Sequence, residues 1–255
     1  MAHESALPGL LHSLMFILPG AFAAAVLRGF TGFGFVMSVV PLLSLVLPPA
    51  QVVPLALLLQ ILVSMLDLRA AMRIADWRSL RWLAPGMVVG TPVGIALLTR
   101  LSPSSARLAI GALIVASVIA LARGVRLPAH PPRWMTFAAG MISGAMNGLS
   151  GMSGPPVMAY LLALPHSMAV VRASAIVFFI ATASIAAVPM AARGLIGQGT
   201  VIAALAALPV LFFGSRLGAW GFSRTGARTH RRVAFAVLLC LAALLISRGL
   251  AGAWE

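Results

Sequence analysis

Long apolar runs separated by short polar segments dominate the chain. The long runs cover residues 8–27, 52–68, 82–98, 107–122, 170–190, 199–221 and 233–250, and shorter ones cover 35–47, 134–147 and 155–165. Because about 20 apolar residues cross a bilayer as a helix, the long runs predict membrane-spanning helices. The pattern therefore predicts an all-α polytopic membrane protein.

Composition excludes the main alternatives to a membrane protein. Of the 255 residues, 61% are hydrophobic and only 9% are charged, and the mean hydropathy is +1.06. Soluble domains are about 45–50% apolar, and a soluble globule has no way to bury so much apolar surface. The chain is also far too hydrophobic for intrinsic disorder.

Charge predicts orientation rather than a nucleic-acid partner. The net charge is +14, and every basic residue is an arginine. The arginines are scattered singly between apolar runs and Tyr160 is the only tyrosine, which does not fit a stacking surface for nucleic acid. Most arginines fall in three segments: Arg69, Arg73, Arg78 and Arg81; Arg123, Arg126 and Arg133; and Arg224, Arg228, Arg231 and Arg232. Arginine-rich loops favour the cytoplasm, so we expect all three there and both termini outside.

The chain begins Met-Ala-His-Glu-Ser, without a basic n-region, so we expect the first run to be a retained membrane segment. The expected location is the bacterial inner membrane. With Cys240 as the only cysteine, we expect no disulfide framework and no multi-cysteine metal site. We also expect no other metal site and no cofactor.

Two stretches of the chain resemble each other. Residues 29–34 match 148–153 at an offset of 119, and Pro85, Gly90, Thr91 and Gly94 match Pro209, Gly214, Ser215 and Gly218 at an offset of 124. Arg107 then falls on Arg231, and these two are expected on opposite sides of the membrane. The match predicts two inverted repeats, residues 1–127 and 128–255, as in many transporters. Chance similarity of two glycine-rich strings is the alternative.

Glycine-rich segments interrupt both halves. Residues 28–34 read RGFTGFG and residues 147–156 read NGLSGMSGPP. So many glycines disfavour a continuous helix, and Pro155-Pro156 suits a helix start. We expect each repeat to open with a broken or re-entrant helix pair, followed by three membrane helices. Such breaks are tolerated in a bilayer only when they are buried in protein or line a cavity.

The breaks are the candidate substrate site. A helix starting inside the membrane points free N–H groups and a positive dipole end at the site, which suits an anion. Candidate binding residues are Arg28, Thr31, Gly32, Phe33, Gly34, Asn147, Ser150, Gly151, Ser153, Gly154, Pro155 and Tyr160. Two alternatives stay open: Arg28 at the cytoplasmic surface, and glycines that serve helix packing only.

Small residues at four-residue spacing predict helix packing. Gly86, Gly90 and Gly94 form one ladder and Gly140, Gly144 and Gly148 another. A homodimer through such faces is a further expectation. The lipid bilayer and a small anion complete the expected partners.

Parts of the sequence also fit two function classes other than transport. Both Gly148-Leu149-Ser150-Gly151 and Gly151-Met152-Ser153-Gly154 fit the G-x-S-G motif of intramembrane serine proteases, but the five histidines lie in loops or at the start of a run. A serine nucleophile needs a nearby base, so we expect no enzyme. A membrane scaffold whose glycines only pack helices is the main alternative to a transporter.

The motifs resemble a known family. Arg28-Gly-Phe-Thr-Gly-Phe-Gly followed by Pro41-Leu-Leu, and Gly151-x-x-Gly-Pro-Pro-x-x-x-Tyr160-Leu, are similar to motifs of the TauE/SafE family of sulfite and organosulfonate exporters. Where many members have three glycines, this chain has Phe33-Gly34-Phe35 and Ser153-Gly154-Pro155. The resemblance implies about eight membrane segments and a small sulfur-containing anion. The combined expectation is a secondary transporter that works by alternating access.

Overall fold

The structure is a computed structural model that describes residues 6–31, 35–123, 131–223 and 227–252. These residues form helices and no strands. The helices are α1 (Ala6–Thr31), α2 (Phe35–Ser44), α3 (Pro49–Ile74), α4 (Trp77–Arg100), α5 (Pro103–Arg123), α6 (Arg133–Ser150), α7 (Gly154–Ala163), α8 (Met168–Ala192), α9 (Gln198–Ala206), α10 (Leu208–Ser223) and α11 (Ala227–Ala251). The predicted all-α class is confirmed for the described residues.

Helices long and apolar enough to cross a membrane account for much of the described chain. Four pass by length and hydropathy, namely α3, α4, α5 and α8, and α9 with α10 makes a fifth if the bent pair is one span. These helices have the length and hydropathy that the predicted membrane class requires. The sequence pattern missed the bend of 41° between α9 and α10 inside the run 199–221. Pro209 explains the bend, because proline lacks an N–H and clashes with the carbonyl four residues earlier.

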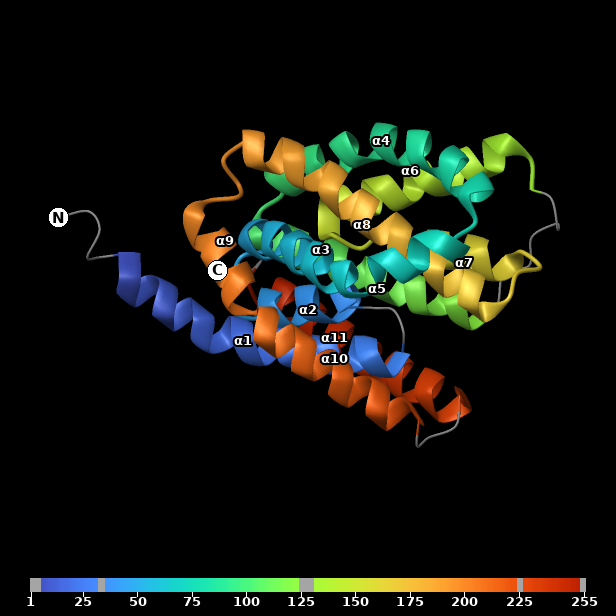
Figure 1. Ribbon diagram of the computed structural model, residues 1–255. Coiled ribbons are helices and arrows are strands. Elements are labelled where there is room, and N and C mark those ends of the chain that lie inside the picture. The colour runs from blue at the N-terminus through green and yellow to red at the C-terminus, as the bar shows by residue number, and fades with distance from the viewer. Residues whose placement is uncertain (1–5, 32–34, 124–130, 224–226, 253–255) are drawn as a thin grey trace.

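Four helix pairs build the bundle. α1 packs against α10, α4 against α6, α3 against α8, and α5 against α11. In Figure 1, α4, α6 and α8 form one part of the bundle and α1, α10 and α11 another, with α2, α3 and α5 between them. Most of the buried apolar residues lie in a cluster that is built mainly from α1, α2, α3, α5 and α11 and also takes in the ends of α4 and α8 and parts of α9 and α10. A second cluster joins the first half of α4 to α7 and the first half of α8.

Interlocked glycines hold α4 and α6 together. A Cβ added at Gly90 would collide with the carbonyl oxygen of Met141, and one at Gly144 with the carbonyl oxygen of Met87. The same close contact recurs along both ladders, so the two backbones approach directly. The predicted packing role of these glycines is confirmed, and it is used within one chain.

The pair α6–α7 folds back on itself as a hairpin. Thr136, near the start of α6, and Tyr160, near the end of α7, share a hydrogen bond of 2.9 Å between their hydroxyl oxygens. The tip of this hairpin is therefore the glycine-rich segment between Ser150 and Gly154. The predicted interruption of the second half is present in the structure.

Candidate functional site

Gly151 ends α6 in a conformation that glycine adopts easily. Its φ is +70°, and its N–H donates to the carbonyl oxygen of Asn147 at 2.7 Å. This left-handed residue closes the helix in the manner of a common C-terminal cap. A Cβ at Gly151 would lie 3.1 Å from Cγ1 of Val36 on α2, so the start of α2 touches the tip of the α6–α7 hairpin.

A small cavity lies where the tip meets α2, and we call it the break cavity. Its volume is about 20 Å³, and its lining comes from α2, α3, α8 and the tip: Phe35, Val36, Met37, Gln60, Gly151, Met152, Ser153, Gly154 and Phe179. This space holds about one water molecule. The residues that follow the first glycine-rich segment thus lie beside the second one. Gly32, Phe33 and Gly34 themselves lie outside the described residues, and of Thr31 only its place as the last residue of α1 is described.

Thr182 on α8 organises the polar side chains at the tip. Its carbonyl oxygen accepts a hydrogen bond from Nδ2 of Asn147 at 2.9 Å, and its hydroxyl lies 3.0 Å from that of Ser153. Asn147, Ser153 and Thr182 are all buried. The hydroxyl of Ser150 donates to the carbonyl oxygen of Met146 at 2.7 Å, within its own helix. The tip is therefore held by side-chain contacts to α8.

Gln60 and Thr182 were absent from the sequence candidates. Gln60 carries a usable signal, because it is a polar residue in the middle of an apolar run. Its Nε2 donates to the hydroxyl of Ser64 at 2.6 Å, one turn along α3. Thr182 carries no comparable signal, because other hydroxyl residues such as Ser174 occur in the same apolar run.

The start of α7 offers fewer backbone donors than a typical helix start. Pro155 and Pro156 have no N–H, which leaves the N–H groups of Ser153 and Gly154 at that end. The Ser153 side chain forms no capping bond to the helix. Any anion at this tip would therefore depend on side-chain donors as well as on the dipole of α7.

Two sequence candidates lie away from the break cavity. Arg28 is buried and pairs with Asp67 at 3.6 Å. Asp67 lies seven residues beyond Gln60 on α3, which is about 10 Å along the helix axis. Tyr160 lies six residues beyond Gly154 on α7, about 9 Å away by the same geometry. The structure thus brings together Asn147, Ser150, Gly151, Ser153, Gly154 and Pro155, but not Arg28 or Tyr160.

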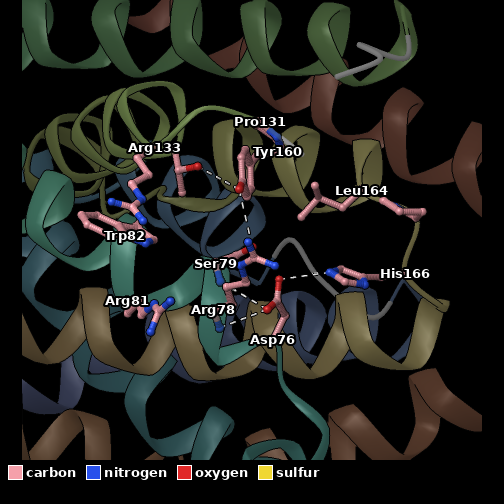
Figure 2. A pocket seen from close by; sticks show the side chains of 12 residues that line it. Asp76, Arg78, Ser79, Arg81, Trp82, Pro131, Arg133, Tyr160, Leu164 and His166 are labelled. Carbon is pink, nitrogen blue, oxygen red and sulfur yellow. Dashed lines mark hydrogen bonds and ion pairs between the residues drawn. The ribbon is translucent and has the colours of Figure 1, made fainter. Parts of the chain in front are cut away.

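Tyr160 instead lines a larger cavity of about 210 Å³, which we call the arginine cavity (Figure 2). Its lining comes from the start of α4, the start of α6 and the end of α7: Asp76, Arg78, Ser79, Arg81, Trp82, Pro131, Arg133, Thr136, Tyr160, Leu164, Pro165 and His166. Arg133 stacks over the ring of Trp82 at 4.9 Å from its centroid. Three guanidinium groups therefore border one cavity.

Asp76 caps α4 at the edge of the arginine cavity. Its Oδ1 accepts hydrogen bonds from the N–H groups of Arg78 at 3.1 Å and Ser79 at 3.2 Å, and its Oδ2 lies 3.0 Å from Nε2 of His166. Burial raises the pKa of Asp76, but hydrogen bonds from Ser79 and His166 lower it more, so the pKa lies below its ordinary value. Asp76 is therefore a carboxylate with both oxygens engaged.

No metal site is evident among the described residues, which contain no group of three His, Cys, Asp or Glu side chains able to hold an ion. The apolar helices and the interrupted pair α6–α7 define a helical integral membrane protein. The sulfite exporter TauE/SafE family matches residues 17–245. The chain therefore belongs to the TauE/SafE family.

Two curated relatives agree with this assignment. Over 223 residues the chain is 29% identical to the probable sulfite/organosulfonate exporter TauE of Cupriavidus necator, covering 85% of this chain and 87% of the relative. Over 198 residues it is 29% identical to the probable inner membrane transporter protein TsaS of Comamonas testosteroni, covering 77% and 82%. No solved structure matches the chain. The protein is a membrane transporter rather than an enzyme, so the protease alternative is set aside.

Proposed function

We propose that the protein is a secondary transporter that moves a small anion, such as sulfite, a sulfonate or a similar organic acid, by alternating access. The substrate is held between the two glycine-rich breaks. The observation that carries this proposal is the contact between Val36 on α2 and Gly151 at the tip of the α6–α7 hairpin. The printed names of the relatives support the substrate class. Because the break cavity is about 20 Å³, the breaks must separate to admit an anion.

The helix pairing supports the two inverted repeats. If α1 to α5 correspond in order to α6, α7, α8, the bent pair α9–α10, and α11, then the pair α1–α10 is equivalent to α6–α4. In the pairs α3–α8 and α5–α11, each helix packs against its own counterpart in the other repeat, so the two-fold relation maps each pair onto itself. A two-fold relation between residues 1–127 and 128–255 requires this pairing.

Individual glycine contacts support the same correspondence. A Cβ at Gly29 would collide with the carbonyl oxygen of Ser215 on α10, and one at Gly148 with the carbonyl oxygen of Thr91 on α4. The sequence match pairs Gly29 with Gly148 and Thr91 with Ser215. Matched residues therefore make matched contacts, which chance similarity does not explain.

The arrangement of the arginines supports a C-terminus outside, as expected for both termini, and the printed name of the TsaS relative supports an inner-membrane location. Arg78, Arg81 and Arg133 gather around one cavity, at the end of the bundle where α4 and α6 begin. α11 ends beside the start of α5, where the hydroxyl of Ser104 donates to the carbonyl oxygen of Gly252 at 2.9 Å. α4 has 24 residues between these two ends, a length of about 36 Å. The arginine-rich end is the cytoplasmic one under the positive-inside rule.

The proposed site combines the break residues with donors from both halves. Asn147, Ser150, Gly151, Ser153, Gly154 and Pro155 form the second break, and Thr31, Gly32, Phe33 and Gly34 form the first. Arg28 supplies a positive charge that Asp67 partly neutralises in this conformation. Movement of α1 relative to α3 would free Arg28 for an anion. Tyr160 contributes its hydroxyl on the path from the arginine cavity.

Uptake of labelled sulfite or a labelled sulfonate into proteoliposomes tests the proposal. We expect Ser150→Ala and Arg28→Ala to lower the initial rate at least about tenfold, as the loss of a charge-assisted contact to a bound anion would. Ser247→Ala is the matched control, because its hydroxyl also donates within its own helix, to the carbonyl oxygen of Leu244 at 2.9 Å, but is exposed on α11. Unchanged uptake in both site variants would overturn the site.

A panel of small anions distinguishes the transporter from a scaffold. If no anion moves or binds, the scaffold alternative gains support.

A homodimer would need a surface other than the glycine ladders, because those of α4 and α6 contact each other within the chain. Cross-linking through cysteines placed on exposed positions of α8, such as Val188, tests such a dimer independently.

A further inference from the structure

The arginine cavity carries more positive charge than its own residues neutralise. It is bordered by the guanidinium groups of Arg78, Arg81 and Arg133 and by one carboxylate, that of Asp76. None of the three arginines forms an ion pair within the part of the chain that the structure describes. All three are exposed along their side chains rather than packed into the core.

The composition of the chain leaves no other carboxylate for them. The sequence contains four acidic residues, of which Glu4 and Glu255 lie at its ends. Asp67 pairs with Arg28 on α1, and both oxygens of Asp76 are engaged by backbone N–H groups and His166. The three guanidinium groups therefore face a cavity whose negative partner comes from outside the chain.

The inner wall of the cavity is polar and ordered. The hydroxyl of Tyr160 lies 2.9 Å from that of Thr136 and donates to that of Ser79 at 3.5 Å. These three residues are buried, and each lies on a different helix. Figure 2 shows Tyr160 and Ser79 between Arg133 and the pair Asp76–His166. Guanidinium donors at the rim and hydroxyl groups at the wall are the groups that hold an oxyanion.

We propose that the arginine cavity binds a small oxyanion, of the sulfonate or sulfite class, as an access site distinct from the break cavity. The proposal rests on the proposed function. α7 connects the two places, because it begins at the break cavity with Gly154 and carries Tyr160 into the arginine cavity. At about 210 Å³ the cavity is smaller than the roughly 300–1,000 Å³ of pockets for drug-sized ligands, which suits a small anion.

A pair of charge-matched double variants tests the access site. Arg78→Gln with Arg81→Gln removes two guanidinium groups from the cavity and keeps Arg133 on Trp82. Arg100→Gln with Arg193→Gln removes the same charge from exposed positions at the far ends of α4 and α8. Both doubles thus lower the net charge of the chain by the same two units, and only the first changes the charge around the cavity.

The readout is concentration-dependent uptake of labelled methanesulfonate and sulfite into liposomes of zwitterionic lipid. We expect the cavity double to raise KM about tenfold with an unchanged maximal rate, and the control double to change KM less than about twofold. The KM of the cavity double should also depend less on salt, since fewer charges are screened. Equal KM values for the two doubles would overturn the access site while leaving transport in place.

A lipid headgroup is the other source of an oxyanion at this surface. If a headgroup occupies the cavity instead, the two doubles will have equal KM values in zwitterionic liposomes. Added phosphatidylglycerol will then raise the KM of the wild type and of the control double, whose cavities are intact, but not that of the cavity double; this result would also overturn the proposal. If the wild type transports nothing, the proposed function fails, and calorimetric titration of methanesulfonate in detergent decides the cavity alone. If the wild type binds methanesulfonate about tenfold more tightly than the cavity double does, the result supports the access site. Equal binding by the two proteins would refute the access site.

Discussion

The hydroxyl groups of Ser153 and Thr182 lie 3.0 Å apart, joining the last residue before α7 to the middle of α8. Thr182 also donates to the carbonyl oxygen of Phe179 at 3.0 Å. The tip of the α6–α7 hairpin is thus anchored to a long apolar helix at one residue, Thr182. If the tip moves during transport, this anchor is the contact that must break or travel with it.

We predict that Thr182→Val slows transport and Thr182→Ser does not. Valine keeps the shape of threonine but removes the hydroxyl that meets Ser153, leaving that buried hydroxyl without its partner. We expect the free energy of unfolding of Thr182→Val to fall by about 1–3 kcal/mol, the cost of an unsatisfied buried polar group. Initial uptake rates in proteoliposomes and the thermal melting temperature in detergent measure the two effects. Equal rates for the valine and serine variants would show that the anchor has no role in transport.

Asn147 provides a second prediction about the same anchor. Its Nδ2 donates to the Thr182 carbonyl oxygen at 2.9 Å, and the side chain is buried. Asn147→Asp replaces the donor by a carboxylate that faces a carbonyl oxygen, so we expect the loss of about 3–5 kcal/mol typical of an uncompensated buried charge.

Asn147→Ala, which adds no charge, is the control for this prediction. We expect it to cost about 1–3 kcal/mol, as a buried carbonyl with a lost donor would. Melting curves of the two purified variants at neutral pH give the comparison. A melting temperature of Asn147→Asp at or above that of Asn147→Ala would contradict the buried-charge argument.

Sequence patterns were sufficient for the interruption at Gly151 but not for its contacts. Three glycines and two adjacent prolines within residues 147–156 disfavour a continuous helix whatever surrounds them. Thr182 differs, because its role depends on α8 crossing the hairpin tip, and that crossing is a property of tertiary packing. Local composition cannot distinguish it from Ser174, whose hydroxyl instead accepts from the N–H of Asp76 at 2.8 Å.

The bend at Ala207, between α9 and α10, likewise depends on tertiary packing that local sequence does not reveal. Pro85 in α4 and Pro209 in α10 occupy matched places in the sequence, yet α4 is one helix and α9–α10 bends by 41°. α4 continues through Pro85 as one helix while its glycine ladder packs against α6. α9 packs against α3 as well as α1, whereas α10 follows α1. The neighbours of a proline therefore decide whether the helix bends.

The close contact of α4 and α6 predicts that stability depends sharply on side-chain size at the ladder glycines. Gly90→Ala places a methyl group against the carbonyl oxygen of Met141, a backbone atom that has no flexible end to move. We expect α4 and α6 to separate locally, at a cost of about 1–3 kcal/mol for an overpacked contact. Gly197→Ala is the control, since nothing lies within 4 Å of its added Cβ. Melting temperatures and monodispersity in detergent check both variants, and equal stability would contradict direct backbone contact.

Asp76 predicts a stability change in acid. Because the pKa of its carboxyl group lies below the ordinary value of 3.8, the folded state favours the ionised form, and this contribution is fully present above the unfolded-state pKa. It is lost as the pH falls through about 4 toward the lower folded-state pKa. The other titratable and charged groups that line the same cavity as Asp76 are His166 and the three arginines.

A comparison of three proteins isolates this carboxylate. Asp76→Asn keeps an oxygen to cap α4, since asparagine caps helices about as well as aspartate, but does not titrate. We expect its melting temperature to lie below that of the wild type at pH 6 and the difference to shrink at pH 3. Asp76→Ala also loses the cap and should cost about 1 kcal/mol more than Asp76→Asn at both pH values. A difference between the wild type and Asp76→Asn that stays constant or widens toward pH 3 would contradict a lowered pKa, because protonation would then remove no stabilising interaction.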